Sequence, residues 1–98
     1  MISSIIIHEF ADLELNEAAK YYESKVDGLG FAFLSEVERV IAQIQDNPES
    51  APRILKSVRR KLLRGFPYSI MYSIVDNSIR ILAIANQKRR PFYWRERQ

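Results

Sequence analysis

The chain has 98 residues, contains no cysteine and carries a formal net charge of +3. This length provides one domain over residues 1–98 and leaves no room for a second core. The absence of cysteine excludes disulfide bonds and thiolate metal sites. No apolar run approaches the ~20 residues that span a bilayer, and the N-terminus lacks the basic start of a signal peptide. We therefore expect a soluble, cytoplasmic protein without membrane contact.

The two halves of the chain have opposite charge. Residues 1–49 hold ten acidic and three basic side chains, a formal charge of −7. Residues 50–98 hold twelve basic and two acidic side chains, a formal charge of +10. A folded domain with one positive face can steer and hold an anionic partner such as nucleic acid, a nucleic-acid-bound enzyme or an acidic peptide. The simpler alternative is a solvated charged surface that binds nothing.

The first half predicts a strand followed by a helical hairpin. The β-branched segment 2–7 is typical of a buried strand. From Glu9 onward, apolar residues recur at steps of three and four, which indicates two amphipathic helices separated at residues 27–30 and ended by residues 46–48. Their apolar stripes are Ala11, Leu15, Ala18, Tyr22 and Val26 in the first helix, and Phe33, Val37, Val40 and Ile44, widened by Leu34 and Ile41, in the second.

The second half predicts an antiparallel meander. Residues 48–57, which include two prolines, indicate a loop or an extended connector. Segments 58–63, 68–75 and 79–85 alternate with a period of two, and residues 76–77 are typical of a hairpin turn. We expect an α+β fold with an N-terminal strand, a two-helix antiparallel hairpin and a three-strand antiparallel meander, the helices covering one face of a mainly antiparallel four-strand sheet. The expected core residues are Ile5, Ile7, Leu15, Ala18, Tyr22, Leu34, Val37, Ile41, Ile44, Ile70, Tyr72, Ile74, Ile81 and Ala83.

The last thirteen residues, 86–98, combine five basic side chains with three consecutive aromatic ones, Phe92, Tyr93 and Trp94. Arginine and aromatic faces together can hold RNA bases and phosphates or anchor a protein interface. Alternatively, the aromatic rings fold back and cap the open edge of the small core. Packing explains the arginines less readily than the aromatic residues.

A series of short motifs runs along nearly the whole chain. They are residues 8–11 (HEFA), 21–23 (YYE), 28–30 (GLG), 46–48 (DNP), 58–60 (VRR), 66–68 (FPY) with Tyr72, and 89–91 (RRP) before Tyr93 and Trp94. In order and spacing they resemble the RelE/ParE superfamily of bacterial toxins from type II toxin–antitoxin modules, also called plasmid stabilisation proteins. The resemblance implies a toxin that a cognate antitoxin holds harmless in a hetero-oligomeric complex. It also implies one of two mechanisms on one fold: cleavage of messenger RNA in the ribosomal A site, or, in the ParE branch, inhibition of DNA gyrase.

The residues favour the ParE branch. In the nuclease branch an arginine commonly follows the first tyrosine of the Tyr-x-x-x-Tyr strand, whereas here Ser69 follows Tyr68. Many relatives carry a histidine at the end of the last strand, where this chain has Asn86, whose amide cannot titrate. The single histidine, His8, lies at the predicted junction of strand and helix, and we expect it to have a structural role there and not a catalytic one. We therefore expect inhibition of DNA gyrase, with ribosome-dependent cleavage of messenger RNA as the alternative.

The nuclease alternative and the target-binding surface share residues. RNA cleavage needs an activated 2′-hydroxyl, a neutralised phosphate charge and a protonated leaving oxygen, and some nuclease relatives achieve this without histidine. The candidates for this chemistry are Arg59, Lys61, Arg89, Arg90 and Tyr93. The predicted target-binding surface consists of Arg59, Lys61, Arg64, Lys88, Arg89, Arg90, Tyr93 and Trp94.

Two expectations accompany this surface. Arg59 and Lys61 share one face of their strand, and the tail leaves the last strand nearby, so all of these residues should form one positive patch. The basic members, together with Arg95 and Arg97, should be side chains that the core does not use.

The expected partners are a cognate antitoxin and a target, either DNA gyrase or the ribosome. The antitoxin would lay an acidic, partly helical segment across the basic residues. No His/Asp/Glu spacing indicates metal ligands and no glycine-rich phosphate loop is present, so we expect neither metal nor cofactor. Two further alternatives stay open: a nucleic-acid-binding module without toxicity, and a weakly toxic homologue retained for its antitoxin contacts.

Overall fold

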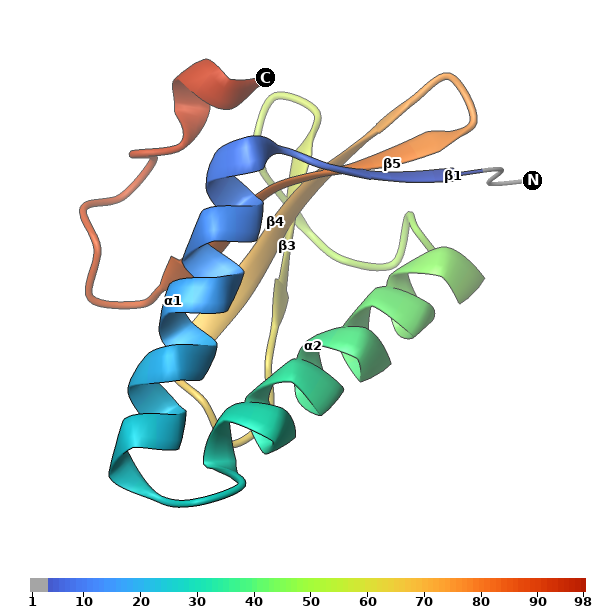
Figure 1. Cartoon of the computed structure of the whole chain (residues 1–98). Helices are drawn as coiled ribbons and strands as arrows, with labels where there is room; N and C mark the ends of the chain where they lie inside the picture. Colours follow the sequence, from blue (N-terminus) through green and yellow to red (C-terminus); the bar gives the residue numbers. More distant parts are fainter. Residues whose placement is uncertain (1–3) are drawn as a thin grey trace.

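The computed structural model describes residues 4–98 and confirms the expected α+β fold (Figure 1). Its elements are β1 (Ser4–Ile7), α1 (Glu9–Lys25), α2 (Leu29–Asp46), β2 (Arg53–Leu55), β3 (Val58–Leu62), β4 (Tyr68–Val75), β5 (Ser78–Asn86) and the 3₁₀ helix η1 (Arg95–Arg97). Both helices lie against one face of a single sheet with the strand order β1-β5-β4-β3-β2. β1 runs parallel to β5, and the other neighbouring strands are antiparallel. Within residues 4–98, no helix is both long and apolar enough to cross a membrane.

The sheet has five strands where the sequence predicted four. β2 lies in the segment expected to be a loop or an extended connector, and it pairs with β3 through Arg53 and Arg59. A three-residue strand is too short to show an alternating pattern, which is why periodicity does not detect it. The predicted first strand began at residue 2. Its first two residues lie outside the described part of the chain.

Local sequence sets the start of α1 and the turn into α2. His8 precedes α1, and its Nδ1 accepts the Phe10 N–H at 3.0 Å, which satisfies one of the unpaired amides of the first turn. This is the structural role expected for the single histidine. At the turn, the Glu23 carboxylate accepts the N–H groups of Gly28 and Gly30 at 2.9 and 3.0 Å. Gly28 has a φ of 86°, a conformation that glycine adopts without steric cost.

Apolar side chains pack on both faces of the sheet. The larger cluster lies between the sheet and the helices, and it includes the aromatic group Tyr22, Phe33, Phe66 and Tyr68, whose neighbouring ring centroids are 4.9 to 6.2 Å apart. The smaller cluster contains Trp94 from the C-terminal segment. It lies on the opposite side of the sheet, which we call the open face.

Most of the predicted core residues are buried or pack against the larger cluster. Leu34 and Ile74 are half-buried. The prediction for Ile7 is wrong, because its side chain is 40% exposed. Ile7 is the last residue of an edge strand, so the sheet shields it on one side only.

A bulge in β5 moves Ala83 into the smaller cluster. Met71 pairs with Ala83, but the next residue of β4, Tyr72, pairs with Ile81, so Leu82 is an extra residue in β5. Strict alternation would place Ile81 and Ala83 on the same face, and the expectation of one core holding both is wrong. Leu82 and Ala83 instead belong together to the smaller cluster.

Candidate functional site

The C-terminal tail, residues 87–98, leaves β5 and runs back beside α1 (Figure 1). Trp94 is only 2% exposed and packs in the smaller cluster with Met71 and Leu82. Its ring therefore caps the core, and this conformation does not offer it to a target. Phe92 remains 40% exposed and has a φ of 60°, a strained conformation for a bulky residue. The Phe92 and Trp94 ring centroids are 5.9 Å apart.

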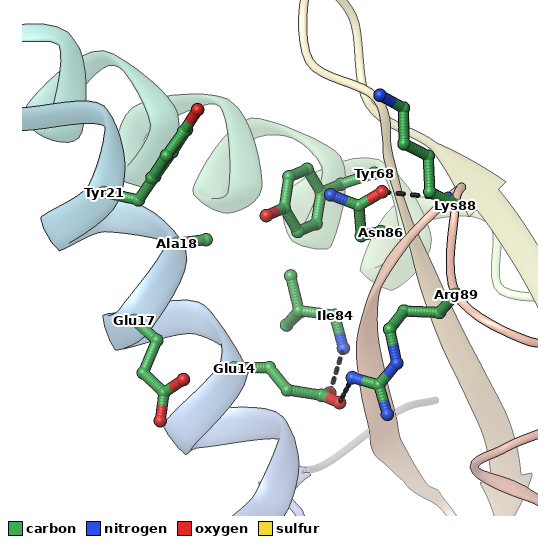
Figure 2. Close-up of a pocket in the computed structure, with 9 residues that line it drawn as sticks. All are labelled: Glu14, Glu17, Ala18, Tyr21, Tyr68, Ile84, Asn86, Lys88 and Arg89. Carbon is green, nitrogen blue, oxygen red and sulfur yellow. Dashed lines mark hydrogen bonds and ion pairs between the residues drawn. The ribbon is translucent and has the colours of Figure 1, made fainter. Parts of the chain in front are cut away.

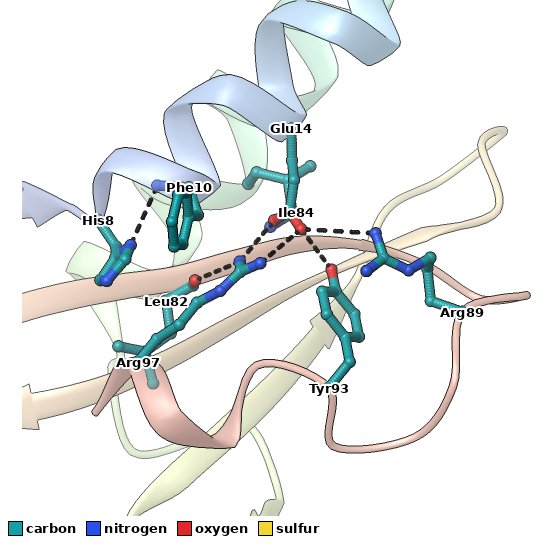
Figure 3. Close-up of polar contacts among 8 residues, drawn as sticks. All are labelled: His8, Phe10, Glu14, Leu82, Ile84, Arg89, Tyr93 and Arg97. Carbon is teal, nitrogen blue, oxygen red and sulfur yellow. Dashed lines mark hydrogen bonds and ion pairs between the residues drawn. The ribbon is translucent and has the colours of Figure 1, made fainter.

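The carboxylate of Glu14, on α1, contacts three side chains of this tail: Arg89, Tyr93 and Arg97 (Figure 3). Glu14 Oε1 accepts the Ile84 N–H at 3.0 Å and Arg97 Nη1 at 2.9 Å. Glu14 Oε2 accepts the Tyr93 hydroxyl at 2.8 Å and Arg97 Nη2 at 3.1 Å. Arg89 Nη1 lies 3.9 Å from the same oxygen. The side chain of Glu14 is only 15% exposed, and bidentate charge-assisted contacts of this kind are stronger than neutral hydrogen bonds.

These contacts cover the part of β5 that β1 leaves unpaired. In the described part of the chain, β1 pairs with β5 only as far as Ile81. Beyond that point the Ile84 N–H donates to Glu14, and the Leu82 carbonyl oxygen accepts Arg97 Nη1 at 3.1 Å. An uncovered strand edge presents unpaired N–H and C=O groups. The side chains of Glu14 and Arg97 therefore satisfy the edge in place of a neighbouring strand.

Tyr93 is a hydrogen-bond donor in this arrangement. Burial raises the pKa of its phenol well above the ordinary value of 10.0, and the hydrogen bond to Glu14 raises this pKa further. The Arg89 guanidinium lies 3.9 Å from the ring centroid and the Arg97 guanidinium 5.1 Å from it. Both cations oppose the rise in pKa without reversing it. In this conformation the hydroxyl proton of Tyr93 is committed to Glu14.

A groove of about 430 Å³ lies on the open face between the sheet and the tail. Three arginines line it: Arg60 from β3, and Arg89 and Arg90 from the tail. Met71 and Trp94 contribute apolar surface. The groove therefore offers positive charge beside an apolar wall, a combination suited to an acidic partner that also buries apolar side chains.

A second cleft, of about 420 Å³, lies between α1 and the ends of β4 and β5 (Figure 2). Glu14 and Glu17 line it on the helix side, and Lys88 and Arg89 line it on the side of the tail. Asn86 Oδ1 accepts the Lys88 N–H at 2.8 Å, which fixes the direction in which the tail departs. Because its opposite walls carry opposite charges, this cleft lacks the uniform positive potential of the open-face groove.

Arg59 and Lys61 lie on the helix side of the sheet. The register of β3 places them opposite Tyr72 and Ile70, which belong to the larger cluster. Arg60, the residue between them, lines the open-face groove instead. The expectation that Arg59 and Lys61 form one patch with the tail is therefore wrong, because the sheet separates them from the groove.

The fold itself uses two of the basic side chains that we expected to be unused. Arg59 Nη1 donates to the carbonyl oxygens of Glu49 and Ala51 at 2.8 and 2.6 Å, so it holds the segment after α2. Arg97 is mostly buried against Glu14. The side chains of the other predicted cations, apart from the half-buried Lys61, are exposed. These exposed residues are Arg64, Lys88, Arg89, Arg90 and Arg95.

The five residues considered for RNA cleavage are not assembled in one place. Arg59 and Lys61 lie on the helix-covered face of β3, whereas Arg90 lines the open-face groove. Arg89 and Tyr93 lie at the edge of β5 beside Glu14. RNA cleavage needs a base, a cation and an acid around one phosphate. Since the Tyr93 hydroxyl donates to Glu14 and Arg59 and Lys61 lie on the helix-covered face of β3, these five residues do not provide that arrangement in this conformation.

The sequence did not single out Glu14 or Arg60, and it indicated Phe92 only as one of three aromatic residues of the tail. Glu14 borders the apolar stripe of α1, next to Ala11 and Ala18 on the helix surface, and a carboxylate at such a border could have been paired with the basic tail. Arg60 is the middle residue of a charged strand, and the alternation of side chains already assigns it to the face opposite its neighbours. The sequence contains no signal for the positive φ of Phe92.

The comparisons with known proteins agree with this geometry. Residues 5–91 match the family model described as "ParE toxin of type II toxin-antitoxin system, parDE". Among solved structures, one titled "Chromosomal ParDE TA system from P. aeruginosa" shares the fold, with a TM-score of 0.63 and 20% sequence identity. The match covers 87% of this chain and 96% of that one. The search of curated proteins found no match.

Proposed function

Because the chain belongs to the ParE toxin family of type II toxin–antitoxin systems, we propose that it arrests growth in the cytoplasm by binding and inhibiting DNA gyrase. The observation that carries this choice is the separation of the candidate nuclease residues. Arg59 and Lys61 lie on the helix side of the sheet, Arg89 and Arg90 lie in the tail, and the Tyr93 phenol donates to Glu14. A site without an assembled base and acid suits binding better than catalysis.

The proposed contact surface is the open-face groove with its exposed rim. Arg60, Arg89 and Arg90 supply positive charge, and the exposed Phe92 ring stands beside them. Gyrase works on a polyanion, and a protein that binds near its DNA path meets negative potential. Arginine and aromatic residues are also the types enriched at the energetic centres of interfaces. Lys88 extends the positive rim.

The nuclease alternative retains one supporting observation. Three arginines and an exposed aromatic ring in one groove could hold a single-stranded RNA segment by charge and stacking. Binding of this kind would still need a base from the ribosome or from a rearranged tail. For that reason we place gyrase inhibition first.

The cognate antitoxin is proposed to neutralise the toxin through the same charges. An acidic, partly helical antitoxin segment would pair with the exposed basic residues and cover apolar surface, in a hetero-oligomeric complex. Exposed apolar side chains beside the basic surface include Leu62 and Phe92.

The test of the proposed surface is the double variant Arg89→Ala/Arg90→Ala. Growth inhibition on induction in a bacterium without antitoxin should be abolished, while circular dichroism and thermal unfolding stay close to wild type, because exposed charges contribute little to stability. The matched control is Arg53→Ala/Arg80→Ala, which removes the same charge from exposed positions outside the groove lining. The control should stay toxic. A folded Arg89→Ala/Arg90→Ala protein with full toxicity would place the target site elsewhere.

A further inference from the structure

We propose that Glu14 is a positioning residue for the target-binding surface: its carboxylate docks the C-terminal tail, and the docked tail fixes Arg89 and Arg90 in the open-face groove. The docking is an inference from the contacts of Glu14. The link to toxicity rests on the proposed function of the groove.

The first step is that Glu14 joins three parts of the chain that are distant in sequence. It lies on α1, it accepts a backbone N–H of β5 at Ile84, and it accepts the side chains of Tyr93 and Arg97 from the tail. The last two lie 79 and 83 residues away along the chain. These contacts share one largely buried carboxylate, so removing its charge affects all of them together.

The second step is that the tail has little structure with which to hold itself in place. Its only regular element in the described chain is η1, with three residues, and helices this short are not stable alone. The strained φ of Phe92 opposes the docked conformation. Docking therefore depends on the burial of Trp94 in the smaller cluster, on the contacts to Glu14, and on the bond from Arg97 Nη1 to the Leu82 carbonyl oxygen.

The third step connects the anchor to the groove. Arg89 stacks on the Tyr93 ring at 3.9 Å and lies 3.9 Å from Glu14 Oε2, so both contacts orient its guanidinium. Arg90 follows directly, and both arginines line the groove together with Tyr93. When the tail is released, these arginines keep their charge but lose their fixed position opposite Arg60. Preorganised cations bind better than mobile ones because their side chains lose less freedom on binding.

The test uses Trp94, the only tryptophan in the chain, as a reporter of docking. In Glu14→Gln, the Trp94 emission should shift to longer wavelength and acrylamide quenching should rise, because the ring leaves its apolar cluster. Hydrogen bonds to charged groups are strong enough that the docking equilibrium should fall roughly tenfold or more. The matched control is Glu17→Gln, which removes the same charge from an exposed position on the same wall of the neighbouring cleft. Its emission and quenching should equal those of wild type.

The functional arm compares growth inhibition at matched amounts of folded protein. Glu14→Gln should inhibit growth less than wild type, in proportion to the docked fraction that Trp94 emission and quenching report, and Glu17→Gln should inhibit as wild type does. If Glu14 served only the stability of the fold, the melting temperature would fall but the emission and toxicity of the folded protein would be unchanged. That result would overturn the proposal.

A second variant keeps the proposal testable if Glu14→Gln does not fold. Arg97→Gln removes the tail side of the contact and leaves α1 and its bond to the Ile84 N–H intact. It should release Trp94 in the same direction. The double variant Glu14→Gln/Arg97→Gln should release less than the sum of the two single effects, because both single variants remove the Glu14–Arg97 contact. Unchanged Trp94 emission in Arg97→Gln would contradict the docking role.

The outcomes also separate this proposal from the proposed function. If Glu14→Gln releases Trp94 but stays fully toxic, while Arg89→Ala/Arg90→Ala is not toxic, then the groove is the target-binding surface and the positioning role of Glu14 is wrong. If Arg89→Ala/Arg90→Ala stays toxic, the proposed surface is wrong whatever the emission of Glu14→Gln shows.

Discussion

At the scale of single residues, the helices contribute carboxylates that hold backbone amides of other elements. Glu14 accepts the Ile84 N–H of β5, and Glu36 Oε2 accepts the Arg64 N–H at 2.6 Å, just after β3. Glu36 also accepts two hydrogen bonds from Arg39, Nε to Oε1 and Nη2 to Oε2, each at 2.7 Å. Part of the acidic half of the chain thus binds its basic half within the molecule, and these carboxylates cannot be counted as solvated surface charge.

Glu36 should make stability depend on acid. The hydrogen bond from Arg39, followed by that from the Arg64 N–H, holds the pKa of Glu36 below its ordinary value of 4.5. A carboxylate with a lowered pKa in the folded state stabilises the fold above pH 4.5, and this contribution is lost as the pH falls through the lowered pKa.

Glu36→Gln should therefore lower the free energy of unfolding at neutral pH by about 1 kcal/mol. The variant should also lose less stability than wild type on acidification below pH 4.5. Urea unfolding at several pH values measures both effects, with the exposed Glu38→Gln as control. Parallel acid profiles for wild type and Glu36→Gln would contradict the assignment.

Tyr93 should make the docked tail sensitive to alkali. Its pKa is raised in the folded protein, so its contribution to stability is complete below pH 10.0 and is lost as the pH rises above that value. The Trp94 emission should therefore shift more steeply above pH 10.0 in wild type than in Tyr93→Phe, which has no phenol to ionise. Tyr22 and Tyr72 also have raised pKa values because of burial, so the difference between the two proteins is the informative quantity. Identical alkaline profiles would show that Tyr93 does not ionise with release of the tail.

At the scale of elements, the two places where backbone regularity breaks decide where the functional surface forms. The bulge at Leu82 turns two consecutive side chains of β5 toward the open face, where Trp94 packs on them. The early end of β1 leaves the rest of the β5 edge to Glu14 and Arg97. The bulge explains why the tail packs across the open face, and the early end of β1 explains why the tail lies beside α1.

The turn between α1 and α2 gives a testable prediction at this scale. A Cβ added to Gly30 would lie 2.5 Å from the Ala19 carbonyl oxygen, so the helices could not keep their close approach. Gly30→Ala should cost about 2 kcal/mol, as overpacking typically does. Gly65→Ala meets nothing within 4 Å and bears only the cost of its φ of 79°, which is about 1 kcal/mol. Thermal unfolding should rank Gly30→Ala as the less stable variant, and the reverse order would contradict the packing described for the hairpin.

At the scale of the whole molecule, the helices carry most of the negative charge, while exposed arginines gather on the groove and the tail. This separation predicts how the antitoxin associates. Its association rate constant with the toxin should fall steeply between low and high salt, because long-range attraction by the basic half accelerates encounter. The dissociation rate constant should change less. Stopped-flow measurement at several ionic strengths tests this, and a salt-independent association rate constant would argue against an acidic antitoxin segment on this surface.

The sequence predicted those parts of the fold that depend on periodicity and turn chemistry. The strand, the hairpin and the meander follow from apolar spacing, and Asp76, in the predicted hairpin turn, does take a positive φ of 49°. β2 could not be predicted, because three residues are too few to show a period. The bulge at Leu82 could not be predicted either, because it shows only in the register between β4 and β5 and not in the spacing of apolar residues. The exposure of Ile7 follows from its place on an edge strand, which composition does not reveal.

The sequence predicted only part of the candidate site. The exposed tail cations Lys88, Arg89 and Arg90 could be recognised because they have no place in an apolar stripe. Arg60 lines the groove in place of the predicted Arg59. This could have been deduced only once it was known which face of β3 the helices cover. The contacts of Glu14 to Tyr93 and Arg97 join residues 79 and 83 positions apart, and a single sequence does not show which tail residue meets which helix residue.

The most direct measurement of the central claim is to induce the toxin without antitoxin in a bacterium and follow the DNA damage response and message integrity in the same culture. We expect filamentation and induction of the damage response while messenger RNA stays intact. Cells that produce Arg89→Ala/Arg90→Ala should show neither filamentation nor the damage response. Ribosome-dependent cleavage of message, with no sign of DNA damage, would contradict gyrase inhibition. It would instead assign the chain to the nuclease mechanism despite Ser69 and Asn86.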